Sequence, residues 1–596
     1  MSLSDLLLGN RGTEAAPAFS PRLWLTATLL LLTLGWATAA SDIQIESAQL
    51  STGGVFTHGY QCIQLRVTNK SRDRTYQVDF RDQGYQGLTT RRLEVKPGAN
   101  SALLWLAPLR TDYSYLQAWV SGEREPVWKF SGSREISGDR PCLLLSRRLN
   151  FDDVNDKLNP VPKPPPAGGK PGSGTPGVSP FGGSSSSMSR RENVNLARAE
   201  MEVNAWFGNW LAYSCYDGVV LAADELHKLP PEVSDAILRY VECGGSVFTF
   251  GPAAAPAGWE RLPPARVGGF QVWNVGFGRW IEIPAPAPAA LDDAQTERFL
   301  NLIGGTRLTH AQYEEFLGKF PVVKKVTVPT GGISLCIITF ALLAGPVNLF
   351  FLIRRNRRIW LLWTTPLLGV LFAGVLVSYF FFGEGIARQA RIQGLTILNE
   401  TTRRATTLAV DGVYCPLPPS EGIRYSTDWE VTPQGEGGNV RGTLDTTSVQ
   451  HFRSGWVKAR IPASFALRTS RHAAERLPIS ATNGRLTAVN GLGAPIRSLL
   501  VRTADGKYHG AANIAPGAEA TLLASAAPAG AAALTGVYES GRWLQPLPAD
   551  GFTIAPGQYL AILDKAVFAD QGLARARYQE VNVVLGISAS LQEGAP

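Results

Sequence analysis

The chain of 596 residues lacks the residue spacings that common catalytic and metal sites require. Its six histidines are scattered, so the zinc patterns His-x-His and His-Glu-x-x-His do not occur. It contains neither a Gly-x-Ser-x-Gly turn nor a Walker phosphate loop. We therefore predict no catalytic residues, no metal ligands and no cofactor, and we expect that the protein is not an enzyme.

Runs of basic residues are also scarce. The net charge is only +8, and the one dense cluster is the four arginines that surround Asn356. Without a further Lys/Arg-rich block the sequence argues against a nucleic-acid partner.

Three nearly charge-free apolar runs are present, and the first lies near the N-terminus. It follows Arg22 and ends in the small residues of 37–40. This pattern is typical of a secretory signal peptide, predicted at 1–40 with cleavage near Ala39 or Ala40. An uncleaved N-terminal anchor is the alternative.

The other two runs, 333–353 and 359–382, each have the roughly 20 apolar residues that a bilayer crossing needs. Only the arginine cluster separates them, and a short basic loop belongs on the cytoplasmic side of a membrane. The sequence therefore predicts a transmembrane hairpin over 333–382 with both large soluble regions extracytoplasmic. Pro346, Asn348 and Pro366 interrupt the spans, and they indicate either packing within the hairpin or contact with a partner at that depth.

Residues 41–138 alternate apolar and polar side chains in short segments that turn signals separate. Segments 62–67 and 76–80 have this pattern, and residues 69–73 form the turn between them. Several such strands at near-regular spacing predict an immunoglobulin-like β-sandwich.

From 139 to 325 buried strands alternate with helical periodicity. Strands are expected at 142–146, 197–203, 216–222 and 246–251, with a helix over 231–243. Strand, helix and strand in alternation predict an α/β domain with a parallel sheet. The stretch 160–189 is dominated by proline, glycine and serine, and it is expected to be a disordered insertion.

The α/β region resembles the class I glutamine amidotransferase-like domain, in the form found in uncharacterised bacterial membrane proteins and in auxiliary subunits of some transport systems. The residues that carry this resemblance are Trp210, Tyr213, Tyr216-Asp217, Val219–Leu221, Leu226, Leu229-Pro230, Tyr240-Val241, Gly244-Gly245, Val247 and the segment 275–282. Enzymatic members place a cysteine nucleophile after a central strand, where this chain has Gly251-Pro252. The resemblance therefore implies a catalytically silent fold in the bacterial inner membrane, with its domains in the periplasm.

Residues 386–596 return to β character, with strands expected at 392–398, 406–410, 485–491, 496–501 and 520–523. The pattern of turns in this β-rich extracytoplasmic region resembles that of bacterial immunoglobulin-like modules.

Export favours disulfides between the six cysteines. Cys215 precedes a predicted strand and Cys243 ends the following helix, so both belong at one edge of the sheet, and we predict a disulfide between them. Asp152 and Asp153 follow another strand and could serve a ligand, with a solvated loop or helix cap as the alternative. Gly276-Phe277-Gly278 is interpreted as a turn or bulge.

These features together predict a non-enzymatic membrane-anchored envelope protein that acts as a scaffold or accessory subunit of a membrane assembly. Its partners would be the lipid bilayer and one or more membrane proteins. One alternative is a ligand or polysaccharide sensor that uses Trp206, Trp210, Trp273 and Trp280, unless these pack in the core. The other is a hydrolase or transferase with an unrecognised site.

Overall fold

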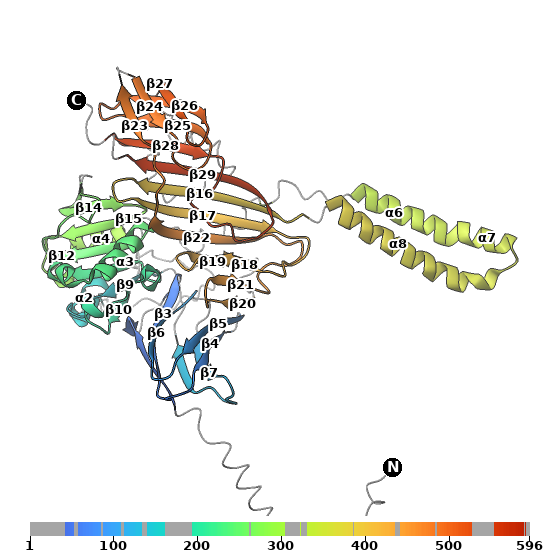
Figure 1. Cartoon of the computed structure of the whole chain (residues 1–596), viewed down its shortest axis with the longest axis horizontal. Coiled ribbons are helices and arrows are strands. Elements are labelled where there is room, and N and C mark those ends of the chain that lie inside the picture. The colour runs from blue at the N-terminus through green and yellow to red at the C-terminus, as the bar shows by residue number, and fades with distance from the viewer. Residues whose placement is uncertain are drawn as a thin grey trace, which may run out of the picture.

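The structure is a computed structural model, and it describes residues 42–52, 56, 58–84, 87–108, 113–133, 140–160, 194–260, 264–303, 322, 330–384, 387–434, 442–482, 485–526, 554–588 and 591. The predicted signal peptide lies outside the described residues, as does the predicted insertion apart from Pro160. Several packed domains form one body, from which a helical hairpin projects (Figure 1). We call the residues before the hairpin the first half of the body and those after it the second half.

The first strands of the chain form two sheets around one core. Trp105, Phe80 and Leu65 are completely buried between the sheets. One sheet contains β1 (Ile43–Gln49), β3 (Tyr60–Asn69) and β6 (Asn100–Pro108), and the other contains β5 (Gly87–Val95), β4 (Tyr76–Gly84), β7 (Tyr113–Val120) and β8 (Trp128–Ser133). The predicted strands 62–67 and 76–80 lie in β3 and β4. The immunoglobulin-like identity of this region stays a prediction.

A mostly parallel sheet follows, as the alternating pattern predicts. Its parallel strands lie in the order β15 (Gly278–Ile283), β12 (Ser246–Phe250), β11 (Gly218–Ala222), β9 (Cys142–Leu145) and β10 (Asn195–Ala199). β14 (Phe270–Val275), β13 (Ala265–Val267) and β2 (Ser51–Thr52) add to its edges antiparallel. The helices are α2 (Phe151–Leu158), α3 (Pro231–Glu242) and α4 (Asp293–Ile303).

Helix α3 shows why the sequence folds this way locally. Pro231 occupies the first helical position, where its missing N–H costs nothing. Val233, Ile237 and Tyr240 recur at helical spacing and are buried. Gly244, at φ +107, ends the helix in a conformation that suits glycine.

The second half of the body is strand-rich. An eleven-stranded sheet has the order β19 (Glu430–Gln434), β22 (Ala463–His472), β17 (Arg404–Tyr414), β16 (Gln389–Asn399), β29 (Arg577–Ile587), β28 (Gln558–Leu563), β25 (Ile496–Arg502), β26 (Tyr508–Ile514), β27 (Glu519–Ala524), β24 (Arg485–Val489) and β23 (Ile479–Thr482). The strands predicted from the sequence lie in β16, β17, β24, β25 and β27. Three short strands, β18 (Ile423–Tyr425), β21 (Gln450–Phe452) and β20 (Gly442–Asp445), instead extend the sheet of β5.

The two halves share backbone hydrogen bonds as well as core. β20 pairs with β5 in parallel, with Gly442 opposite Gly87. A Cβ at Gly87, which has φ +139, would lie 2.1 Å from the Gly442 carbonyl oxygen, so this close approach requires glycine. Tyr60 and Trp210 share one hydrophobic cluster with residues of β16, β17 and β29. Both halves must therefore lie on the same side of any membrane that the hairpin crosses.

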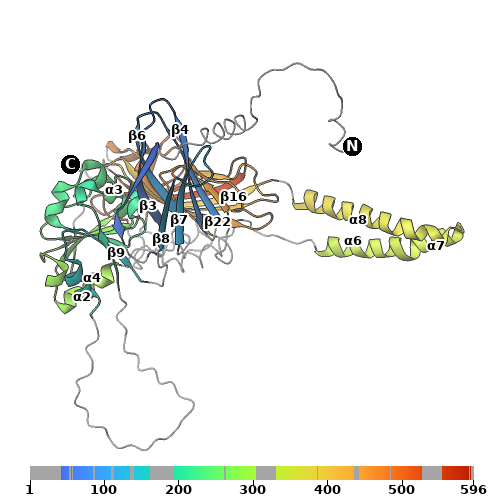
Figure 2. The same cartoon turned by 90° about the horizontal axis from the view of Figure 1, so that it is seen from below.

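The hairpin contains two helices that are long and apolar enough to cross a membrane, Gly331–Arg354 and Arg358–Ser378. It is built from α6 (Thr330–Leu342), a π-helical turn (Leu343–Val347), α7 (Asn348–Arg354), a 3-10 turn (Arg358–Trp360) and α8 (Leu361–Glu384). The π-helical turn contains Pro346, which cannot donate a backbone hydrogen bond. The arginine loop lies at the tip far from the body (Figure 2).

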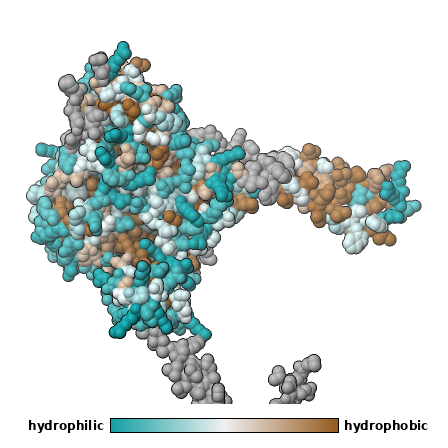
Figure 3. Space-filling view, in the orientation of Figure 1, coloured by the Kyte–Doolittle hydropathy of each residue, from teal (hydrophilic) through white to brown (hydrophobic). Residues whose placement is uncertain are grey.

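Side chains of the hairpin are apolar on the outside, and the surface view shows this apolar cover between a polar tip and the polar body (Figure 3). Leu362 and Trp363, for example, are 76% and 74% exposed. The Asn348 amide points inward and donates to the Thr364 hydroxyl at 2.8 Å. Contact between the two helices of the hairpin therefore provides a hydrogen-bond partner for the Asn348 side chain.

Candidate functional site: the junction between the two halves

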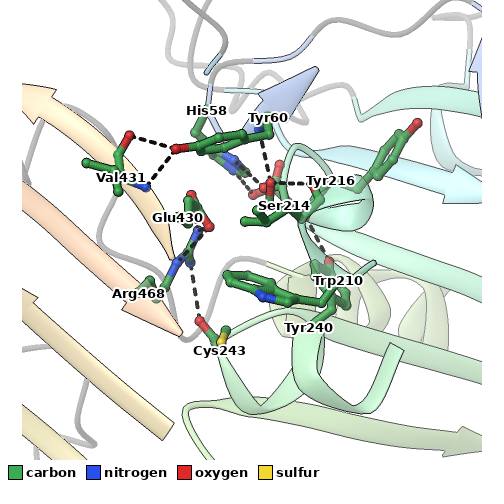
Figure 4. A network of polar contacts seen from close by, with 12 residues as sticks. His58, Tyr60, Trp210, Ser214, Tyr216, Tyr240, Cys243, Glu430, Val431 and Arg468 are labelled. Carbon is green, nitrogen blue, oxygen red and sulfur yellow. Dashed lines mark hydrogen bonds and ion pairs between the residues drawn. The ribbon is translucent and has the colours of Figure 1, made fainter. Parts of the chain in front are cut away.

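A network of long-range polar contacts lies where the two halves of the body meet (Figure 4). The first half contributes residues 58–60 at the start of β3, the segment 210–217 that begins with a 3-10 turn, and α3. The second half contributes β17, β19, β21 and β22. We call this region the junction.

Tyr60 links three parts of the junction. Its hydroxyl donates to Gln450 Oε1 at 2.6 Å and accepts from the Val431 amide at 2.9 Å. Its backbone amide donates to the Ser214 hydroxyl at 3.0 Å. The Gln450 amide group continues the network by donating to the Trp429 carbonyl at 2.6 Å. Since Tyr60 is only 2% exposed, these bonds join the halves out of contact with water.

A serine, a histidine and an aspartate also meet in the junction, and their geometry can be tested against that of a hydrolytic triad. His58 Nε2 lies 2.9 Å from Asp217 Oδ1, as a triad requires. However, His58 Nδ1 faces the Ser214 backbone carbonyl at 3.0 Å, not its hydroxyl. The Ser214 hydroxyl donates to the Leu211 carbonyl at 2.7 Å and is fully buried. A nucleophilic serine must be accessible to substrate, and its hydroxyl must donate to a general base. The Ser214 hydroxyl meets neither requirement, so the trio does not have the geometry of a hydrolytic triad.

Two buried carboxylates of the junction each meet an arginine. Glu430 is paired with Arg468, whose Nε donates to Glu430 Oε2 at 3.1 Å. Arg468 Nη1 also donates to the Cys243 carbonyl at the end of α3, at 3.3 Å. Because Arg468 belongs to β22, its bond to Cys243 ties the end of α3 to the second half, and Glu430 holds the arginine in place.

Glu242, at the last turn of α3, has no exposed surface at all. Its carboxylate accepts from Arg404 Nη1 at 3.3 Å, from the Trp259 indole at 3.4 Å and from the Ser470 hydroxyl. A buried carboxylate costs free energy unless it is paired in this way. The turn at Gly276 packs closely there, since a Cβ on Gly276 would lie 2.6 Å from the Glu242 carbonyl oxygen. Gly276 and Phe277 form the two-residue turn between β14 and β15, as the sequence predicts.

The structure has Cys215 and Cys243, for which the sequence predicts a disulfide, as two buried thiols. Tyr240 packs against residues that neighbour these cysteines in the chain. Its hydroxyl donates to the Tyr216 carbonyl at 2.8 Å, and a Cβ on Gly245 would lie 2.2 Å from its ring. Burial raises the pKa of the Cys243 thiol, which disfavours the reactive thiolate.

The other candidates from the sequence lie away from the junction or in the core. Asp152 and Asp153 form the first turn of α2, where Asn150 accepts from the Asp152 amide at 3.2 Å, so they match the helix-cap interpretation. Gly251 follows β12 at φ +102 and has no side chain to serve as nucleophile. The four tryptophans proposed for a sensor are buried in the core: Trp206, Trp210, Trp273 and Trp280. Within the described residues no group of three or more His, Cys, Asp or Glu could hold a metal ion.

Sequence reasoning missed the residues that make the junction. Glu242, Arg404 and Arg468 look like ordinary helix-end and strand charges. Asp411, a buried carboxylate within the second half, had a stronger signal, because it interrupts the apolar segment 408–413. It is fully buried, its Oδ2 accepts from the Tyr425 hydroxyl at 2.9 Å and the Gly572 amide at 3.0 Å, and desolvation raises its pKa to about 7.

Comparison with known protein families finds no match to this chain, and comparison with curated proteins finds no relative. The resemblance to amidotransferase-like domains therefore stays a prediction.

Proposed function

We propose that the protein is a non-enzymatic scaffold or accessory subunit of a membrane assembly. In this proposal the hairpin anchors it in the bacterial inner membrane, and the body lies on the extracytoplasmic side. The observation that supports it is the junction: segments on both sides of the hairpin are joined through β5–β20 pairing, the Glu242–Arg404 ion pair and the bond from Arg468 to the Cys243 carbonyl. Such a body is a rigid platform whose position is set by the membrane.

The arrangement of His58, Asp217 and Ser214 also favours a structural role over catalysis. The three residues lie where the halves join, and the serine hydroxyl is committed to a backbone carbonyl. The histidine ring contacts Asp217 and the Ser214 carbonyl, so both side chains are held by contacts within the first half.

The proposal is tested by crosslinking in native membranes, gentle purification of the tagged full chain, and mass spectrometry of the copurified proteins. We expect a membrane protein in a fixed ratio to the chain. Recovery of the chain alone after efficient crosslinking would contradict the scaffold function.

Orientation needs its own test. In a Cys336→Ser background, single cysteines are placed at Thr427, exposed on the body, and at Asn356, in the arginine loop. An impermeant maleimide added to cells with a permeabilised outer membrane should label Thr427→Cys at once and Asn356→Cys only after lysis. The reverse order would place the body in the cytoplasm.

A further inference from the structure

Four adjacent strands end on the side of the body from which the hairpin leaves. Gln389 of β16 lies opposite Tyr414 of β17 and Arg577 of β29, and Val413 lies opposite Ala463 of β22. The chain passes from the end of α8 at Glu384 to Gln389 in five residues. At about 3.8 Å for each Cα–Cα step, the start of β16 lies within about 19 Å of the end of α8, and the other three strand ends lie one or two strands from it. They are therefore next to the bilayer that the hairpin enters.

The segments around these strand ends, 387–389, 415–424, 458–462 and 570–577, are called the hairpin-side rim. Their basic residues outnumber their two acidic residues, Glu421 and Asp570. Glu421 already pairs with Arg388 at 3.6 Å, and Asp570 accepts from the Ser426 amide at 3.0 Å. The basic residues of the rim are Arg388, Arg424, Lys458, Arg460, Arg575 and Arg577, all exposed except the half-buried Arg388.

Two large apolar side chains stand exposed on the same rim. Leu417 is 54% exposed and Ile461 is 42% exposed, and a proline follows each of them. A surface that combines exposed apolar side chains with lysine and arginine has the composition of a membrane-interface surface. Exposed to water, the leucine and isoleucine side chains contribute no free energy of burial, whereas insertion among lipid headgroups would bury them.

A cavity of about 510 Å³ adjoins the rim and shares Glu421 and Arg424 with it. His451 and Arg453 also line this cavity, together with Pro418 and Trp456. His451 Nε2 lies 2.8 Å from the Glu421 carbonyl oxygen, and Arg453 Nη2 lies 2.6 Å from Asp445 Oδ2. The rim thus continues into a hollow that Arg424 and Arg453 line, of a size that suits a lipid headgroup.

We propose that the hairpin-side rim docks onto the anionic headgroups of the bilayer. Leu417 and Ile461 insert among the headgroups, while the arginines and Lys458 contact lipid phosphates. Each basic residue near an anionic membrane surface strengthens binding about fivefold. The hairpin then fixes where the body is, and the rim fixes how the body is tilted. This proposal needs the hairpin to cross a bilayer, but it does not depend on a protein partner.

The test uses the full chain in nanodiscs of phosphatidylcholine, alone or mixed with phosphatidylglycerol, with a trace of lipid that carries a fluorescence quencher near its headgroup. The background is Cys336→Ser, because the other five cysteines are buried. A fluorophore is attached at Leu417→Cys, and a reference fluorophore at Leu523→Cys, which is 70% exposed on β27. We expect strong quenching at position 417 with phosphatidylglycerol, weaker quenching without it or at high salt, and none at position 523.

A charge-reversal variant, Arg460→Glu/Arg575→Glu/Arg577→Glu, should reduce quenching at position 417 to the level of position 523. The matched control reverses three exposed basic residues elsewhere in the second half, Arg476→Glu/Arg485→Glu/Lys565→Glu, and should leave quenching unchanged. Equal quenching at positions 417 and 523 in both membranes would overturn the proposal. So would crosslinking that places a protein partner, in a fixed ratio, over Leu417. The scaffold function would survive either result, since its own test is copurification.

Discussion

The body and the hairpin place polar and apolar side chains in opposite ways. In the body, most large apolar residues are buried, and the buried carboxylate of Glu242 has an ion-pair partner. In the hairpin, apolar residues such as Leu362 face outward, and the Asn348–Thr364 bond lies between the helices. The comparison teaches that the polarity of exposed side chains follows the surrounding medium. Polar side chains cover the body, as water requires, and apolar side chains cover the hairpin, as lipid requires.

The comparison also predicts how much each buried polar contact is worth. When one partner of a buried ion pair in the body is removed, the remaining charge has neither an ion-pair partner nor water to solvate it. In the hairpin, both residues are neutral, and separated helices still find other partners in the membrane. Polar substitutions in the junction should therefore cost more than those in the hairpin.

The largest effect is expected for Arg404→Leu, which leaves the buried Glu242 carboxylate without its cation. Breaking a buried pair from one side costs about 3–5 kcal/mol in the free energy of unfolding. Denaturant titration of the full chain in detergent measures this change in the free energy of unfolding. Arg497→Leu, in the exposed pair with Asp564, is the control and should cost about 1 kcal/mol or less. Equal losses for the two variants would show that Glu242 does not need Arg404.

A second prediction concerns Asp411, whose pKa of about 7 in the folded protein lies above its ordinary value because burial disfavours the charged form. The folded state therefore holds a proton that the unfolded state releases between about pH 4 and pH 7. Stability should fall as pH rises through this window and then level off, with a total change of a few kcal/mol.

Asp411→Asn should remove this part of the pH dependence, because a neutral amide keeps an oxygen for the Tyr425 hydroxyl and the Gly572 amide. The variant should be more stable than the wild type at pH 8. Parallel pH profiles for the two proteins would contradict a raised pKa at Asp411.

Tyr60→Phe tests the uncharged part of the junction. The substitution removes one hydroxyl and leaves Gln450 Oε1 and the Val431 amide without their partner. Unsatisfied buried groups cost about 1–3 kcal/mol. Tyr115→Phe, at a side chain that is 52% exposed, serves as the control and should change the unfolding free energy little. A result for Tyr60→Phe as small as that of the control would mean that the two halves are held together without this hydroxyl.

The smallest effect is expected in the hairpin. Asn348→Leu removes the bond to Thr364, and hydrogen bonds between membrane helices average about 0.6 kcal/mol. A double-mutant cycle with Thr364→Val, measured by unfolding in mixed micelles, isolates the bond. A coupling energy as large as the loss in Arg404→Leu would remove the contrast between lipid and water.

Prediction from sequence was accurate where local pattern dominates. Predicted strand 246–251 is β12 at Ser246–Phe250, and predicted helix 231–243 is α3 at Pro231–Glu242. It says less about Cys215 and Cys243, which the spacing assigns to one edge of the sheet and which are buried thiols in the structure. Spacing along the chain does not fix the distance between two sulfur atoms.

The sequence by itself determined the elements: two apolar helices around an arginine loop, a run of parallel strands, and β segments on both sides of the hairpin. Each of these follows from the periodicity of apolar residues, which is a property of neighbouring residues. Only the tertiary structure decided that the halves join, that β20 extends the sheet of β5, and that Glu242 meets Arg404. These contacts link residues more than 150 positions apart, so they depend on how packed surfaces fit together, and no local pattern encodes that fit.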